Sequence, residues 1–288
     1  MVPQTLLSTE ISGAMQYLLA VIMGLVEGIT EFLPISSTGH LILVGDLLGF
    51  DRAVGKEFAG AFEIVIQLGA ILAVVVAYPG RFVGLASFRE NRGLKGLRGI
   101  GLLVITSIPA GLLGLLARKS IRESLFLPVP VTIALAVGAI WILLVEWRPR
   151  RSRVAEVDAL GWREALAVGL FQCLSLWPGM SRSASTILGG MMVGVERKAA
   201  TEYSFFAAVP IMIAASFYEL YKSRELLDAS HLGILAVGFV VSFLSAWAAV
   251  RLFVQFLTRH TLAPFGWYRL AIAALFGVLA LGGLVTVD

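Results

Sequence analysis

Residues 27–40 combine acids, hydroxyls and an imidazole inside an apolar segment that spans residues 13–50. Two carboxylates, Glu27 and Glu31, lie four residues apart, so on a helix they share one face. A charged side chain at mid-membrane costs about 2.5–3.5 kcal/mol on insertion scales. Two acids with His40 nearby therefore indicate a chemical role rather than a structural role alone.

A helix break follows the two acids. Pro34 cannot continue a helix, because it lacks a backbone N–H and its ring clashes with the preceding turn. The sequence predicts a new helix that begins at about Ser36 to Thr38. Taken alone, hydroxyls in this place are most often only a helix cap. The unpaired N–H groups of a helix start also attract anions, phosphate above all. The cost of the two neighbouring acids in a membrane makes a purely structural explanation of the whole motif less favoured.

A second break, Trp177-Pro178-Gly179, precedes another run of hydroxyls that contains Arg182. Arginine is permanently charged and can bind two phosphate oxygens at once. A lone arginine between segments is more often a loop charge, but an internal repeat aligns this one with Ser37. If the two breaks converge, their hydroxyls and N–H groups form a phosphate cradle with one arginine.

The acids beside such a cradle could hold a hard divalent cation, Mg²⁺ or Ca²⁺, through oxygen. His40 can move a proton near neutral pH, and Ser37 or a water molecule could attack phosphorus. Glu63 and Gln67 lie four residues apart in another apolar segment. They could face the same cavity, or they could form a hydrogen bond between helices.

The composition places these motifs in a membrane. Of the 288 residues, 58% are hydrophobic and 15% are charged, with a mean hydropathy of +0.87. These values are typical of a polytopic membrane protein and not of a soluble domain. The single cysteine, Cys173, excludes an internal disulfide and a cysteine-based metal site. We expect one integral membrane domain over residues 1–288, with its first apolar segment retained, because its start does not resemble a cleaved signal peptide.

Ten apolar stretches follow one another, and most could cross about 30 Å of hydrocarbon. Two pairs are joined by the breaks, 14–33 with 35–49 and 161–176 with 182–194. Their second members are short, which is typical of re-entrant hairpins. The predicted fold is an all-α polytopic membrane protein with these two re-entrant helical hairpins and six transmembrane helices, at residues 58–78, 100–117, 129–146, 200–221, 232–257 and 266–284.

An internal repeat accompanies the two hairpins. A shift of 145 residues places Ser36-Ser37-Thr38 over Ser181-Arg182-Ser183, and three glycines over glycines. Repeat one covers about residues 14–146, and repeat two covers about residues 161–284. Each repeat has one hairpin and three spans, an odd number of crossings, so the second repeat must be inverted. Inverted repeats with broken helices bring polar sites together near the bilayer centre.

The basic residues favour one orientation. Fourteen lie on the side of the loops at 79–99 and 147–163, with Arg259 and Arg269 counted as loop charges, and seven lie on the other side. The richer side should be cytoplasmic, which places both termini and the mouth of the first hairpin outside. If all ten stretches spanned the membrane, the loops at 79–99 and 147–163 would also lie on one side. The charge distribution alone therefore does not exclude ten full spans.

At the two breaks the sequence closely resembles the bacterial undecaprenyl-diphosphate phosphatase family, also called the bacitracin-resistance proteins. The first signature is residues 27–40, and the second is Pro178-Gly179-Met180-Ser181-Arg182-Ser183 with Thr186. The similarity includes residues 62–69 and 208–210 and covers nearly the whole chain. The sequence departs from the family at Ala184-Ser185, where the family often has Gly-Ala. We expect these two residues to affect helix packing.

The resemblance implies hydrolysis of undecaprenyl diphosphate to the monophosphate and inorganic phosphate, which recycles the lipid carrier for peptidoglycan and confers bacitracin resistance. It implies a divalent cation and a site at the periplasmic or outer face of the cytoplasmic membrane. Glu27 and Glu31 would bind metal or act as base, Ser37 would be the nucleophile, and His40 would be the acid–base group or a rival nucleophile. The residues implied to bind the diphosphate are Arg182, Ser36, Thr38, Ser181, Ser183 and Thr186.

The expected partners are this lipid and the membrane, with no nucleic acid, and the assembly could be a homodimer. A lipid or ion transporter is the main alternative, because inverted repeats and broken helices are also a transporter's design. An intramembrane serine protease using Ser37 and His40 would leave Arg182 and both acids without a role. Nucleotide-binding, zinc-protease and hydrolase-fold motifs are absent from the sequence.

Overall fold

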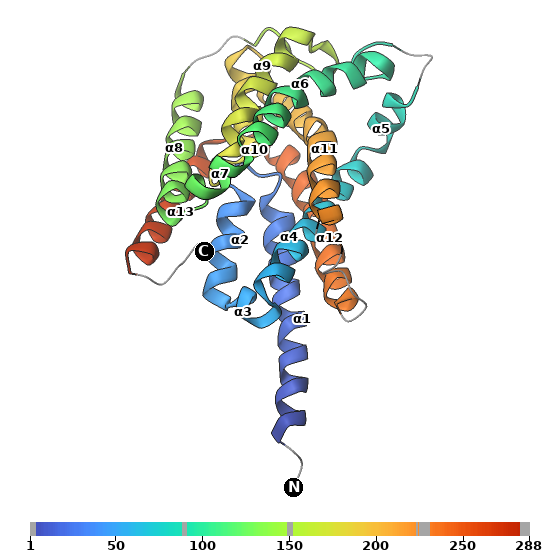
Figure 1. Ribbon diagram of the computed structural model, residues 1–288. Coiled ribbons are helices and arrows are strands. Elements are labelled where there is room, and N and C mark those ends of the chain that lie inside the picture. Colours follow the sequence, from blue (N-terminus) through green and yellow to red (C-terminus); the bar gives the residue numbers. More distant parts are fainter. Residues whose placement is uncertain (1–3, 88–90, 149–151, 223, 225–230, 283–288) are drawn as a thin grey trace.

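The computed structural model describes residues 4–87, 91–148, 152–222, 224 and 231–282. This part of the chain consists of helices, turns and loops and contains no strand (Figure 1). Its one β-type pairing is an isolated bridge between Val154 and Val195. The first half contains α1 (Gln4–Thr30), α2 (Ser37–Leu48), α3 (Phe50–Val54), α4 (Lys56–Ala77), α5 (Pro79–Leu85), α6 (Gly96–Leu116), α7 (Arg118–Leu125) and α8 (Pro128–Trp147). The second half contains η1 (Val157–Ala159), α9 (Trp162–Gln172), η2 (Cys173–Leu176), α10 (Arg182–Met192), α11 (Arg197–Lys222), α12 (Leu232–Leu257) and α13 (Ala263–Leu281).

Among the described residues, six helices are long and apolar enough to cross a membrane, which confirms an all-α polytopic architecture. Five of them, α4, α6, α8, α11 and α12, are predicted spans. The sixth is Gly13–Thr30 in α1, which the sequence assigned to a re-entrant hairpin. By contrast, Ala263–Leu279 in α13 is a shorter apolar segment over the residues described there. By length alone, therefore, α1 qualifies as a span and α13 does not, and the re-entrant paths stay a prediction.

Both predicted helix breaks are present, and they share one backbone geometry. Ser36 caps α2 and Ser181 caps α10, and each has a φ of 73°. Each cap hydroxyl accepts a hydrogen bond from the backbone N–H three residues later. Positive φ outside glycine is uncommon and costs on the order of 1–3 kcal/mol, and such residues cluster at functional sites. The two strained serines lie 145 residues apart, in agreement with the repeat.

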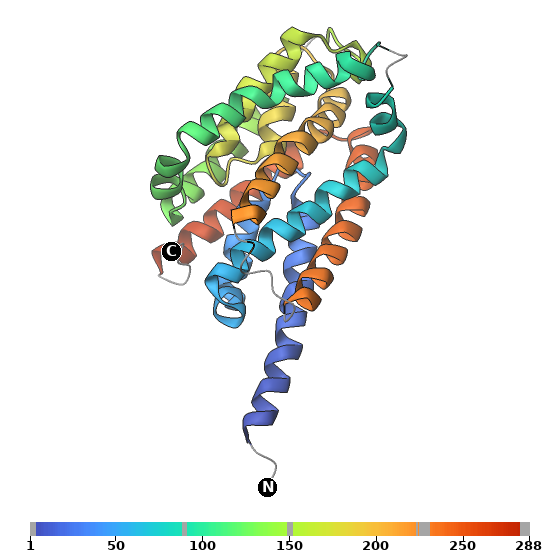
Figure 2. The same cartoon turned by 45° about the vertical axis from the view of Figure 1, so that its right-hand side comes forward.

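The two halves pack on each other reciprocally. α1 lies along α12, and α4 packs against α11 and α12, as Figures 1 and 2 show from two directions. α9 lies along α6, and α8 lies along α13. Gly28 allows the close approach of α1 to α12, because a Cβ there would lie 2.0 Å from Ser245 Oγ. In the 145-residue repeat α9 matches α1 and α6 matches α12, so the α9–α6 contact is the counterpart of the α1–α12 contact.

The structure corrects one assignment in the charge count. Arg269 is not a loop charge, because it lies inside α13 with a fully buried side chain. Without it, the richer side holds thirteen basic residues against seven. Of these thirteen, Arg89, Arg150 and Arg151 lie outside the described residues. The charge asymmetry is retained, so the predicted orientation is unchanged.

The loop between α5 and α6 is held to η1 by Asp158. Arg81 Nη1 donates to Asp158 Oδ2 at 2.6 Å, and the Leu94 N–H donates to Oδ1 at 3.0 Å. Partial burial acts to raise the pKa of the Asp158 carboxyl. The Arg81 and Leu94 hydrogen bonds, with the charges of Arg81 and Lys95, outweigh burial and lower this pKa below its usual value. Asp158 therefore favours the folded state only while it is ionised.

We expect Asp158→Asn to lower the melting temperature in detergent by a few degrees at pH 7. The carboxylate is 42% exposed, so its ion pair is worth at most about 1 kcal/mol. Because its folded pKa is depressed, this stabilisation is complete above about pH 4 and is lost as pH falls through the folded pKa. The difference in melting temperature between wild type and variant should shrink in acid. A difference that grew in acid would contradict this assignment.

Candidate active site

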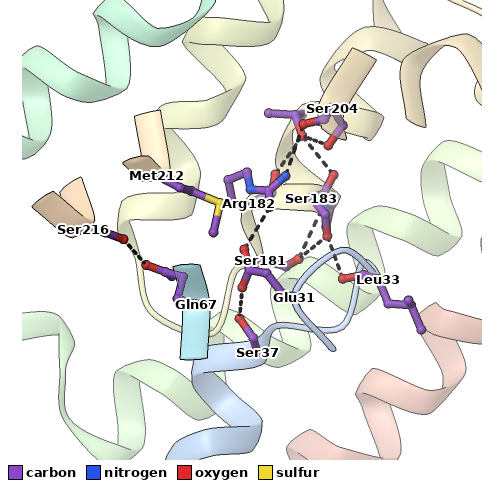
Figure 3. A network of polar contacts seen from close by, with 12 residues as sticks. Glu31, Leu33, Ser37, Gln67, Ser181, Arg182, Ser183, Ser204, Met212 and Ser216 are labelled. Carbon is purple, nitrogen blue, oxygen red and sulfur yellow. Dashed lines mark hydrogen bonds and ion pairs between the residues drawn. The ribbon is translucent and has the colours of Figure 1, made fainter. Parts of the chain in front are cut away.

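The two helix breaks meet in the interior, although they are far apart in the sequence. Arg182, the first residue of α10, forms an ion pair with Glu31, just after α1, with Nη2 2.9 Å from Oε1 (Figure 3). Their side chains are 13% and 6% exposed. Ser183 Oγ donates to the Leu33 carbonyl at 2.6 Å. The structure therefore brings together the acid and the guanidinium that the sequence placed in one pocket.

Ser37 completes this arrangement from the first residue of α2. Its hydroxyl donates to Glu31 Oε2 at 2.5 Å, while Oε1 faces Arg182 (Figure 3). A short O–H···O⁻ bond of this kind is charge-assisted. Glu31 is thus placed to accept the Ser37 proton, which would convert the hydroxyl into a nucleophile.

Arg182 retains donor capacity inside the protein. Nη1 donates to the Ser204 carbonyl at 3.2 Å, Nη2 lies 3.3 Å from Met212 Sδ, and the guanidinium lies over the Phe32 ring at 5.2 Å. Its buried Nε has no hydrogen-bond partner in the described residues. An unused N–H on a buried guanidinium favours binding of an anion, since buried donors are normally paired.

The other hydroxyls of the second break bind the protein itself. Ser181 Oγ caps α10 and lies 3.0 Å from Ser183 Oγ. Thr186 lies one turn into α10, where its hydroxyl bonds to the Arg182 carbonyl at 2.9 Å and to Ser204 Oγ at 2.6 Å. These contacts shape the break, and binding of phosphate by these hydroxyls stays a prediction.

His40 faces a different set of groups. Nδ1 lies 2.7 Å from the Ser36 carbonyl, and Nε2 lies 2.8 Å from the Tyr268 hydroxyl. Both ring nitrogens are thus engaged away from Ser37 and Glu31. Attack by His40 on a phosphate would require loss of the Tyr268 bond. Thr38, the remaining predicted ligand on α2, is half-buried.

Glu27 is the candidate metal ligand with free capacity. Its side chain is 1% exposed, and Oε1 has no partner in the described residues. No group of three or more potential metal-ligating side chains is found among those residues. Mg²⁺ is commonly held by one or two carboxylates together with substrate phosphates. Glu27 therefore has a free oxygen that fits a cation whose coordination is completed by the substrate. Glu31 could join it only by releasing Ser37 or Arg182, which occupy its two oxygens. Gln67 lies in α4, and its side-chain Oε1 accepts a hydrogen bond from Ser216 Oγ in α11 at 3.3 Å. This contact agrees with the interpretation of Gln67 as a link between helices.

Sequence reasoning missed two neighbours in α13, Tyr268 and Arg269. Tyr268 bonds to His40, and Arg269 donates to carbonyls of both breaks. A signal for Arg269 was present, because it lies in an apolar stretch, where an ionisable residue is by default a functional candidate. Tyr268 had no such signal, since tyrosine near a segment end normally indicates a membrane interface.

Known proteins are similar to this chain over most of its length. The family model described as bacitracin resistance protein BacA matches residues 20–275. The undecaprenyl-diphosphatase of Solidesulfovibrio magneticus is 56% identical over 257 residues, 89% of this chain and 96% of the relative. That of Nitratidesulfovibrio vulgaris strain DP4 is 58% identical over 256 residues, covering 89% and 95%. The undecaprenyl-diphosphatase 2 of Rhodospirillum rubrum is 50% identical over 271 residues, covering 93% and 96%. The resemblance seen in the sequence is therefore confirmed, and the chain is a member of the bacitracin resistance protein BacA family.

Proposed function

We propose that this protein hydrolyses undecaprenyl diphosphate to undecaprenyl phosphate and inorganic phosphate. The observation that carries the proposal is the cluster in which the buried Glu31 binds the partly buried Ser37 and Arg182 across the two breaks. The cluster combines a nucleophile, a base and a phosphate-binding cation. The name shared by the relatives supports undecaprenyl diphosphate as the substrate.

The geometry supports a two-step reaction at the terminal phosphorus. Ser37 Oγ attacks this phosphorus, Glu31 takes the hydroxyl proton, and the bond to the bridging oxygen breaks, so that undecaprenyl phosphate leaves. Water then hydrolyses the phosphoserine, releasing inorganic phosphate and restoring the Ser37 hydroxyl. Arg182 and the N–H groups at the starts of α2 and α10 bind phosphate oxygens throughout.

Glu27 and Glu31 are the residues that would hold a divalent cation, Mg²⁺ or Ca²⁺. A bound cation supplies charge compensation to the phosphate oxygens. Glu27, which has an unpartnered oxygen in the described part of the chain, would keep the cation beside the base without taking part in proton transfer.

A phosphate-release assay with and without chelator tests the function. Purified protein with Mg²⁺ or Ca²⁺ should release phosphate from a prenyl diphosphate. Chelator should lower the rate at least about tenfold, and added cation should restore it. Glu27→Gln should raise the cation concentration needed by about tenfold, which is typical of the loss of a supporting ligand. Release unaffected by chelator would contradict the cation requirement. If lipid bound but no phosphate appeared with either cation, the proposed function would be wrong.

We also propose that the chain is an inverted repeat in the cytoplasmic membrane, with its site and both termini on the outer side. The matching φ values at Ser36 and Ser181 and the reciprocal packing of α1 on α12 and α9 on α6 support the repeat. The charge asymmetry supports the orientation. At that face the reaction would recycle the lipid carrier for peptidoglycan and, by lowering the diphosphate that remains, confer resistance to bacitracin.

A transporter on the same scaffold is the second candidate, favoured by the same reciprocal packing. Flux in sealed vesicles without phosphate release would support it against the phosphatase. Phosphate release without flux would exclude it.

A further inference from the structure

Arg269 lies where both helix breaks approach α8. Its side chain is fully buried, and each of its five guanidinium N–H groups has a carbonyl acceptor. The acceptors are the carbonyls of Gly179 (2.8 Å), Met180 (3.0 Å), Ala134 (3.1 Å), Pro34 (3.2 Å) and Leu135 (3.3 Å). Three separate segments, the two breaks and α8, are therefore held by one planar group.

This environment is specific for arginine. A buried charge is costly unless it is paired or fully hydrogen-bonded, and no acid pairs with Arg269 among the described residues. The carbonyl dipoles stabilise it instead. Lysine has only three donors and no planar fork, so it cannot reproduce the five bonds. Gly138 in α8 provides the room, because a Cβ there would lie 2.1 Å from Arg269 Nη2.

The carbonyls held by Arg269 lie directly before the catalytic cluster. Pro34 is three residues before Ser37, and Met180 is two residues before Arg182. Between each carbonyl and the cluster lies a serine with a φ of 73°. An Arg269 that moved would free the backbone at both strained serines together, and Ser37 and Arg182 would no longer be fixed relative to each other.

We propose that Arg269 is a positioning residue that sets the placement of Ser37 and Glu31 against Arg182, without touching the substrate. This inference rests on the proposed phosphatase function for its kinetic consequences. It also predicts a structural consequence that does not depend on activity. A misplacement of about 1 Å at reacting groups can cost about 10²-fold in rate.

Two variants displace the guanidinium by different routes. Arg269→Lys removes the fork, and Gly138→Ala keeps Arg269 but fills the space that its Nη2 occupies. Gly111→Ala in α6 is the matched control, because nothing lies within 4 Å of a Cβ at Gly111. Arg269→Lys and Gly138→Ala should each lower kcat for phosphate release by about 10²-fold per folded molecule, with a smaller change in KM. The double variant should lose little more than either single variant, because both act through one group. The control should match wild type.

Hydrogen–deuterium exchange in detergent provides the readout that is independent of catalysis. Both displacing variants should speed exchange of amides at residues 34–40 and 178–184 together, and the control should not. The proposal would be overturned by kcat within twofold of wild type, by additive losses in the double variant, or by faster exchange in neither break or in one break alone. If wild type itself released no phosphate, the proposed function would fail, and the exchange data alone would decide the role of Arg269.

Discussion

Arg182→Met should lower kcat/KM for a prenyl diphosphate by about 10²- to 10³-fold. Truncation of one partner in a buried, hydrogen-bonded charge pair costs about 2–5 kcal/mol, and about 1.4 kcal/mol corresponds to a factor of ten. Arg182 is 13% exposed and keeps an unused Nε donor, so we expect that solvent could not replace the contacts that Arg182 would make with phosphate. The measurement is steady-state phosphate release in detergent.

Two further variants separate binding from damage to the fold. Arg182→Met alone leaves Glu31 buried and unpaired, which should destabilise the protein by about 3–5 kcal/mol. The double variant Glu31→Gln with Arg182→Met removes both charges and should recover much of that stability without recovering activity. Arg182→Lys keeps the charge without the fork and should lose less than Met. Activity within threefold of wild type in Arg182→Met would remove Arg182 from the site.

Ser37→Ala should abolish turnover, with a loss in kcat on the order of 10⁴-fold or more, because it removes the proposed nucleophile. The reason is structural: the Ser37 hydroxyl is the one bonded to Glu31, at 2.5 Å, while His40 faces Tyr268. Ser245→Ala is the control, because it removes a hydroxyl that bonds within α12 and lies against α1. It should leave phosphate release unchanged.

The intermediate provides an independent check on the same prediction. Wild type quenched in acid during turnover should carry phosphate on the peptide that contains Ser37, detected by mass spectrometry. Retained turnover in Ser37→Ala, with no phosphopeptide in wild type, would reassign the attack to water or to His40. In that case Tyr268→Phe, which removes the hydrogen bond to His40 Nε2, should alter turnover as well.

The local structure at the breaks could be predicted from the sequence because its causes are local. Pro34 ends one helix, and the hydroxyl after it caps the next, so the start of α2 at Ser37 follows from residue types alone. The convergence of Glu31 and Arg182 was predicted from the repeat, because two equivalent breaks in inverted halves would meet near one axis. The ion pair confirms the convergence, and the inversion stays a prediction. The roles of these residues, and the cation, remain predictions.

Contacts that depend on tertiary packing could not be predicted in this way. Arg269 was assigned to a loop because it lies near the start of α13, and its five acceptors come from segments 89 to 235 residues away. Tyr268 and His40 are 228 residues apart, and no residue pattern links them. The path of α1 is not settled by its length, since α1 is long enough to span although its break predicts a hairpin, and the re-entrant path stays a prediction.

The Glu31–Arg182 ion pair also has a consequence for how the catalytic cycle ends. Glu31 is the counter-ion of Arg182, so we expect an incoming diphosphate to displace a carboxylate already in place. Either product carries less negative charge than the diphosphate and competes less well for the same guanidinium. We therefore expect Glu31 to act as an internal competitor that favours departure of the products, and we expect an inhibitor to need more charge than a monophosphate to remain bound.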